Sequence, residues 1–221
     1  MWVGLSGDDF IHGLILTHSR QLAAYRDHSL WRLFEFASPR IDPALFNEGI
    51  LAWWADPQFK LAFFRPLSAL THALDYALWP RSPLLMHVHN FIVFAFVLAA
   101  LHRLYRELLP LWAATLALAF YAFDPTHAIA ITWIANRNAL IACALSSYAV
   151  TLHLRSARAW SAALFALAMF GGEGAIGATP YLFAAELFLA DDAYSRRALR
   201  LLPYALIAIA SLLLARCLGY G

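Results

Sequence analysis

The stretch Leu84–His102, LLMHVHNFIVFAFVLAALH, is an almost uninterrupted apolar run. A helix needs about 20 predominantly apolar residues to cross a bilayer, so this run predicts a membrane-spanning helix. The whole chain has the same character. Of its 221 residues, 62% are apolar and 14% are charged, and the mean hydropathy is +0.61. Soluble domains contain roughly a quarter charged residues. The composition therefore excludes an ordinary soluble protein and favours an integral membrane protein.

Further apolar runs follow this stretch, and together they predict an all-α, polytopic membrane bundle over residues 84–221. The alternating segments of about ten residues that are typical of membrane barrels do not occur, so the spans should be helices. Several runs are shorter than the ideal span, which favours helices packed against protein or water. The six predicted spans are 84–102, 109–123, 138–154, 159–171, 175–190 and 199–218.

Residues 1–83 are more polar and are predicted to form a separate segment with amphipathic interfacial helices. Between Phe10 and Phe36 charges interrupt the apolar pattern too often for a span, which favours one or two surface helices. Asp42-Pro43 predicts the start of a short helix that ends at Trp53-Trp54, an aromatic pair typical of a membrane interface. Arg65-Pro66 opens a further helix with one leucine stripe, formed by Leu67, Leu70, Leu74 and Leu78.

The arginines predict which end of the bundle faces the cytoplasm. The positive-inside rule assigns arginine-rich connections to the cytoplasmic side, so the other connections and residues 1–83 should face outward. The predicted location is a bacterial inner membrane with this face in the periplasm, or the endoplasmic reticulum membrane with this face in the lumen. The arginines of alternate connections are Arg103 and Arg106, Arg155 and Arg158, and Arg196, Arg197 and Arg200.

An outward N-terminal segment needs a preceding helix or signal to carry it across the membrane. Residues 1–7 are too short for a basic region followed by an apolar core. Two interpretations remain open. Either Met1 lies inside a longer reading frame whose first span is missing, or the predicted orientation is reversed, and we favour the first.

Several charged and polar residues are predicted to lie on the outward side. Asp8 and Asp9 are adjacent, directly ahead of a helix expected from about Phe10. They suit a helix N-terminus, and they also suit a functional site, because charge at the bilayer rim is costly. Asp124 could act in a site or form a turn with Pro125. His127 could contact a substrate or bond a loop carbonyl.

Other chemistries have little support in the sequence. Cys143 and Cys217 lie in apolar runs and do not suggest a disulfide framework or a metal site. His87 and His89 should point to opposite sides of a helix, so they are poorly placed to share a metal. Paired acids can hold a divalent cation, but no metal is assigned. The arginines are dispersed, which gives no indication of a nucleic-acid partner.

The motifs of the chain occur in a characteristic order. They are Asp8-Asp9-Phe10, Phe64-Arg65-Pro66-Leu67-Ser68, His72 with Asp75, His87 with His89-Asn90, Asp124-Pro125-Thr126-His127, Trp133 with Asn136-Arg137, and Glu173. In this order the chain resembles the N-terminal part of the C-type (GT-C) membrane glycosyltransferases, close to their protein O-mannosyltransferase-like and tetratricopeptide-linked O-mannosyltransferase-like members. It departs from them at Asp124 and Ile129, where the family often has His and Glu, and at Gly172, where it often has Lys.

This resemblance implies transfer of a sugar from a polyprenyl-phosphate donor to an acceptor hydroxyl on the outer face. Asp8 or Asp9 would be the general base and would stabilise the oxocarbenium-like charge. Arg65 and Arg137 would bind the lipid phosphate. His127, Glu173 and Asp124 would also contact the substrate. The sugar, the lipid and the protein or glycan acceptor remain unspecified. The alternative is a non-catalytic membrane protein, either a degenerate scaffold or a transporter-like protein.

Overall fold

The computed structural model describes residues 4–19, 21–37, 44–56 and 58–220. Ten α-helices and five short 3₁₀ helices make up most of these residues, with one two-stranded sheet. The prediction of an all-α fold is therefore confirmed in its coarse form. The sheet was not predicted. Strand β1 (Glu35–Ala37) pairs antiparallel with β2 (Leu61–Ala62) inside the N-terminal segment.

The N-terminal segment has a small core of its own. Helix α1 (Asp8–Leu16) packs with β1 around buried side chains that include Ile15, Leu33 and Phe34. One or two surface helices were predicted between residues 10 and 36. In the structure this region contains α1 and two 3₁₀ turns, η1 (Ala23–Tyr25) and η2 (Leu30–Arg32).

The helix predicted to run from Asp42-Pro43 to the tryptophan pair is much shorter in the structure. Its start lies outside the described residues, and α2 (Ala44–Asn47) ends before the tryptophans. Trp53 and Trp54 are 85% and 73% exposed. This exposure is consistent with aromatic side chains that meet a membrane interface.

Helix α3 (Pro66–Leu78) begins at the proline, as predicted, because a proline at the first helical position gives up only an N–H that has no helical acceptor. The helix buries its polar face: Ser68, His72 and Asp75 face the bundle. Leu70, Leu74 and Leu78 are about half exposed, at 48%, 49% and 58%. The amphipathic pattern was therefore recognised correctly, and these three leucines of the stripe face outward, away from the bundle.

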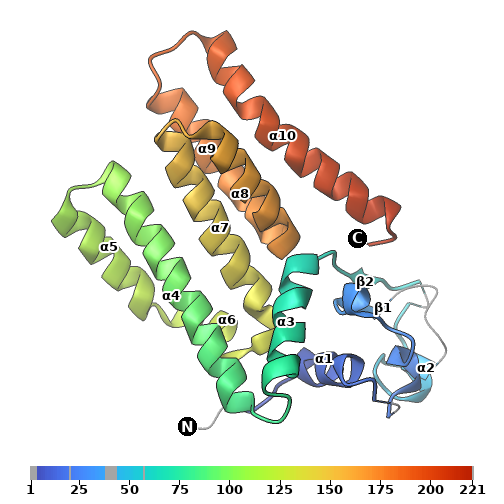
Figure 1. Cartoon of the computed structure of the whole chain (residues 1–221). Helices are drawn as coiled ribbons and strands as arrows, with labels where there is room; N and C mark the ends of the chain where they lie inside the picture. Colours follow the sequence, from blue (N-terminus) through green and yellow to red (C-terminus); the bar gives the residue numbers. More distant parts are fainter. Residues whose placement is uncertain (1–3, 20, 38–43, 57, 221) are drawn as a thin grey trace.

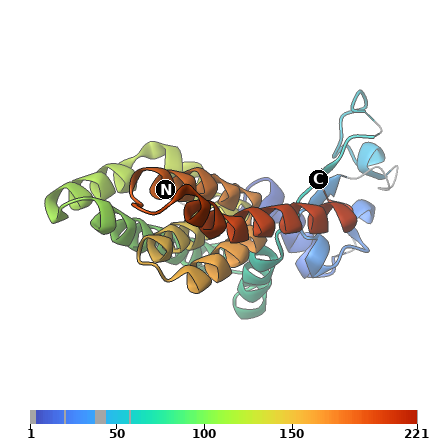
Figure 2. The ribbon, with the colours of Figure 1, turned by 90° about the horizontal axis from the view of Figure 1, so that it is seen from above.

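The remaining helices form an up-and-down bundle with α7 at its centre, packed between α4 and α8 (Figure 1). Helix α10 runs from the far end of the bundle back toward the N-terminal segment (Figures 1 and 2). There the hydroxyl of Tyr220 donates to the carbonyl oxygen of Trp31 at 2.8 Å. The bundle helices are α4 (Pro83–Leu108), α5 (Leu111–Phe123), α6 (Ala128–Thr132), α7 (Arg137–Leu154), α8 (Arg158–Gly171), α9 (Thr179–Phe188) and α10 (Tyr194–Cys217). The 3₁₀ turns among them are η3 (Pro125–His127), η4 (Ile134–Asn136) and η5 (Glu173–Ala178).

The prediction of six membrane spans is wrong by the criterion of length and hydropathy. Among the described residues only α4 and α10 are long and apolar enough to cross a membrane. A third candidate is the bent pair formed by α5 and the segment Pro125–Thr132, with 51° between its parts. The helices found at the predicted spans 109–123, 138–154, 159–171 and 175–190 do not, taken singly, meet this criterion of length and hydropathy.

Two physical reasons explain this difference. Helix α8 has 14 residues and α9 has 10. At 1.5 Å per residue they are about 21 and 15 Å long, short of the roughly 30 Å of a hydrocarbon core. Helix α7 opens with Arg137-Asn138 and carries further polar side chains, and most of its residues are buried in the bundle.

Candidate functional site

A cavity of about 280 Å³ lies where the N-terminal segment meets the loop before α7. Two of the predicted site residues, Asp8 and Arg65, line it together, although they come from distant parts of the sequence. An aromatic wall accompanies them, formed by Phe34 and Phe36 at β1 and by Phe63 directly after β2. The lining residues are Asp8, Phe34, Phe36, Leu61, Phe63, Arg65, Trp133, Ala135, Asn136 and Asn138.

Asp8 occupies the first turn of α1, where the helix dipole favours an acidic side chain. The chain enters this turn through Gly7, whose φ of +51° is a conformation that glycine adopts at little cost. The side chain is half-buried. Burial raises the pKa of Asp8 above its usual 3.8, and the charge of Asp9 raises it further, while Arg65 opposes both effects. A carboxylate with a raised pKa is a better proton acceptor than an ordinary aspartate.

Asp9 has a different environment from its neighbour. It is 3% exposed, and its two oxygens accept from the backbone N–H groups of Ser6 at 3.0 Å and Ala135 at 2.6 Å. Burial raises its pKa although these hydrogen bonds act in the opposite direction. Asp9 therefore ties the start of α1 to the loop before α7, and it does not line the cavity. The sequence could not distinguish the two acids, whereas their surroundings do.

Arg65, directly before α3, and Glu173, at the start of η5, form a bidentate ion pair. Nε of Arg65 donates to Oε2 of Glu173 at 2.9 Å, and the second guanidinium nitrogen donates to Oε1. The guanidinium also lies over the rings of Phe63, at 4.1 Å, and Phe34, at 5.2 Å. Burial alone would raise the pKa of Glu173, but the hydrogen bond and charge of Arg65 outweigh it and lower the pKa. Glu173 thus adjoins the cavity through Arg65 and does not line it.

Arg137, predicted to bind phosphate, is fully buried beside α3 and α4. Its guanidinium donates to Asp75 at 2.5 Å and to Asn90 at 2.9 Å. The other oxygen of Asp75 lies 2.5 Å from Nδ1 of His89. With its donors engaged in this network and no exposed surface, Arg137 is placed to join three helices and not to meet a ligand in the cavity.

Asp124 and His127 lie outside the cavity, in the loop after α5. The exposed carboxylate of Asp124 accepts from the N–H of Thr126 at 2.8 Å and caps η3, and these hydrogen bonds lower its pKa. The turn interpretation is therefore confirmed for its local geometry. The ring of His127 packs on that of Tyr121, with centroids 4.0 Å apart.

Sequence reasoning missed the aromatic wall, and it named His72 only as part of a motif, without its place behind this wall. His12 and His72 are buried against Phe34 and Phe36. Burial, and then the charge of Arg65, lower the pKa of His12 to about 3, so this ring is neutral at pH 7. The signals in the sequence were the position of His12, one turn after the acid pair, and the occurrence of His72 with Asp75 in the motif series. Phenylalanines in an apolar chain carry no comparable signal.

Trp133 supplies a hydrogen-bond donor next to the cavity. Its ring lies beside Gly7, and the structure gives its buried indole N–H no acceptor among the described residues. Within the same residues, no three His, Cys, Asp or Glu side chains are grouped so that they could hold a metal ion. No protein-family model, curated protein or solved structure matches the chain.

Proposed function

We propose that this chain is a membrane glycosyltransferase, or a fragment of one, and that the Asp8 cavity is its transfer site. The donor would be a polyprenyl-phosphate-linked sugar and the acceptor a hydroxyl group. The observation that carries the proposal is that Asp8, a carboxylate with a raised pKa, and Arg65, a cation, line one cavity.

The proposed reaction needs one base and one cation. The acceptor oxygen attacks the anomeric carbon while a carboxylate oxygen of Asp8 takes the hydroxyl proton. The bond from the anomeric carbon to the phosphate oxygen breaks, and its electron pair leaves with the lipid phosphate. Arg65 would stabilise the negative charge of this leaving group. The indole N–H of Trp133 would donate to an oxygen of the sugar.

A membrane location is part of this proposal. It is supported by the two helices that are long and apolar enough to cross a bilayer and by the outward leucines of α3. We propose a multi-pass arrangement with the Asp8 cavity on the outer side. In Figure 1 the connections after α4, α7 and α9 lie at the end of the bundle far from α1, and the arginines lie in these connections or in the helices that flank them.

The second candidate function is a scaffold without catalytic activity. It is favoured by the charge balance of the cavity, because Glu173 already neutralises Arg65 and Arg137 is buried elsewhere. A leaving phosphate would have to compete with Glu173 for the guanidinium. Glu173→Gln should therefore strengthen binding of the lipid phosphate in an enzyme, since it frees Arg65.

The two functions are separated by transfer and binding assays on the protein in membranes. The probe is a short-chain polyprenyl-phosphate mannose with a hydroxyl-bearing peptide as acceptor. In an enzyme, Asp8→Asn abolishes transfer and leaves donor binding intact, whereas Asp27→Asn, at an exposed acid of the same segment, changes neither. Donor binding without transfer by the unmodified chain would reject the enzyme proposal, and equal transfer by Asp8→Asn would reject Asp8 as the base.

A further inference from the structure

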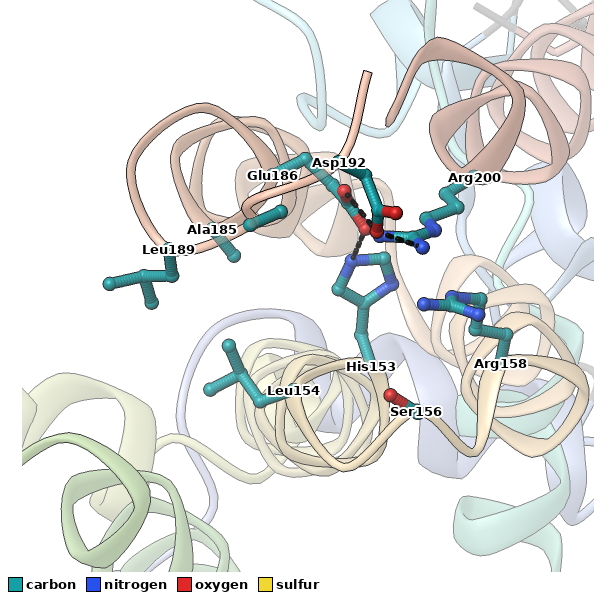
Figure 3. A pocket seen from close by; sticks show the side chains of 10 residues that line it. His153, Leu154, Ser156, Arg158, Ala185, Glu186, Leu189, Asp192 and Arg200 are labelled. Atoms are coloured by element: carbon teal, nitrogen blue, oxygen red, sulfur yellow. Dashed lines mark hydrogen bonds and ion pairs between the residues drawn. The ribbon is translucent and has the colours of Figure 1, made fainter. Parts of the chain in front are cut away.

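A second polar cavity, of about 240 Å³, lies at the opposite end of the bundle from Asp8. Helices α7, α9 and α10 and the turn into α8 surround it (Figure 3). It contains two cations and two carboxylates beside a histidine, separated from the Asp8 cavity by most of the bundle length. The lining residues are His153, Leu154, Ser156, Arg158, Ala185, Glu186, Leu189, Ala190, Asp192 and Arg200.

Most of these charges are already paired. Glu186 is 4% exposed and lies 3.0 Å from Nε2 of His153 and 3.3 Å from a guanidinium nitrogen of Arg200. Asp192 pairs with the same guanidinium. The other ring nitrogen of His153 lies 2.9 Å from the hydroxyl of Tyr204. Both carboxylates, Arg200 and His153 therefore have partners within the protein.

Arg158 is the exception among these side chains. Its guanidinium points toward the other charged groups in Figure 3, but within the described part of the chain no hydrogen bond or ion pair reaches it. Its Nε is buried without an acceptor. Arg158 is also the first residue of α8, whose N-terminus has no side-chain cap. A buried unpaired N–H is costly, so among the described residues the guanidinium of Arg158 is the donor in this cavity that is free to bind an acceptor from outside the chain.

An apolar groove between α4, α7 and α9 adjoins this cavity. The groove encloses about 250 Å³ and shares Leu154, Ala185 and Leu189 with the polar cavity. Its other walls are apolar side chains of α4, α7 and α9 with Tyr181. A cavity with an unpaired guanidinium beside an apolar groove is complementary to a molecule with an anionic head and a hydrocarbon tail.

We propose that this joined site binds an anionic phospholipid, with the headgroup phosphate at Arg158 and one acyl chain in the groove. A planar guanidinium can donate two parallel hydrogen bonds to a phosphate. The backbone N–H groups of the first turn of α8 and the hydroxyl of Ser156 are further donors at the same end. The groove favours a lipid over a free anion, because an acyl chain would cover its apolar side chains and a free anion would not. This site lies apart from Asp8 and needs no sugar transfer.

The test compares Arg158→Gln with Arg155→Gln in the full chain. Arg155 lies three residues away, but it is exposed and pairs with Glu107. The lipids retained after purification are measured by native mass spectrometry, and binding is measured in nanodiscs of phosphatidylcholine with increasing phosphatidylglycerol. We expect phosphatidylglycerol to bind the unmodified chain and Arg155→Gln equally, and Arg158→Gln about tenfold or more weakly, as for the loss of one charge-assisted hydrogen bond.

Two further arms make the outcome decisive. Ala184→Trp narrows the groove while Arg158 stays in place, so it should also weaken phosphatidylglycerol binding, and it decides the question if Arg158→Gln does not fold. Inorganic phosphate is added to the protein in detergent. Equal stabilisation by phosphate and by phosphatidylglycerol would overturn the lipid proposal in favour of a free anion. Equal lipid affinity in Arg158→Gln and Arg155→Gln would overturn the site itself.

Discussion

Replacing Arg137 by methionine should strongly destabilise the fold. Arg137 and Asp75 are both fully buried, and the guanidinium contacts Asp75, Asn90 and the carbonyl oxygens of Thr71 and Met86. Methionine fills much of the volume but leaves a buried carboxylate without its main counter-charge. Removing one member of a buried ion pair costs about 3–5 kcal/mol. We expect a loss of this size in the free energy of unfolding.

The assay is unfolding in mixed micelles of increasing dodecyl sulfate content, followed by far-ultraviolet circular dichroism. The double variant Arg137→Met with Asp75→Leu removes both charges. It should be more stable than Arg137→Met alone, because a buried ion pair replaced by apolar side chains is often neutral in stability. This rescue separates an uncompensated charge from a simple packing defect.

The matched control is Arg155→Met, which breaks the exposed pair with Glu107 and should change stability very little. Two results would refute the reasoning. One is an unfolding midpoint for Arg137→Met equal to that of Arg155→Met. The other is a double variant whose loss equals the sum of the two single losses, since the pair would then have no coupling.

Three further variants, at Asp8, Asp9 and Gly171, should change the stability of the fold. Asp8→Asn should be more stable than the unmodified chain at pH 7, because the raised pKa of Asp8 means that the fold disfavours its charged form. This gain in the free energy of unfolding, measured across pH, should disappear as the pH falls below 3.8, the ordinary pKa of an aspartate. Asp9→Ala should instead lose about 1–3 kcal/mol, since the buried N–H of Ala135 loses its acceptor, and an unchanged midpoint would contradict this role. Gly171→Ala should lose about 1–3 kcal/mol, measured by thermal unfolding, because its new Cβ would lie 2.8 Å from Cγ2 of Ile141. Gly174→Ala is the control, since a Cβ there would have nothing within 4 Å.

Short sequence patterns predicted where some helices begin and which helices are long and apolar. Proline at the first helical position predicted the start of α3, and the apolar runs predicted the two long helices α4 and α10. That Asp8 and Arg65 line the same cavity could be inferred only from the resemblance, because no local sequence pattern shows that α1 and α3 lie close together. Sequence reasoning could not separate Asp8 from Asp9, since adjacent acids differ only in what the fold places around them.

The failures have a common physical cause. The hydropathy pattern predicts a helix, but it does not show whether a face of that helix packs against lipid or against other helices. Helix α7 was therefore predicted as a membrane span, although its polar side chains are buried in the bundle. The lining of the second cavity was missed because His153, Glu186 and Arg200 come from three different helices. Each of these residues alone is unremarkable, and only the packing of α7, α9 and α10 brings them together.

The orientation of the apolar side chains supports the proposed membrane location more strongly than helix length does. In α10 only Tyr204 is buried, and in the apolar window of this helix only 6% of the residues are buried inside the protein. On α3 the leucines face outward while Ser68, His72 and Asp75 face inward. In water such a surface would oppose the hydrophobic effect, because contiguous apolar patches are rare on soluble monomers. Against lipid or further apolar helices the same arrangement is favourable, since buried polar groups then find partners inside the bundle and the leucines find an apolar surrounding outside it.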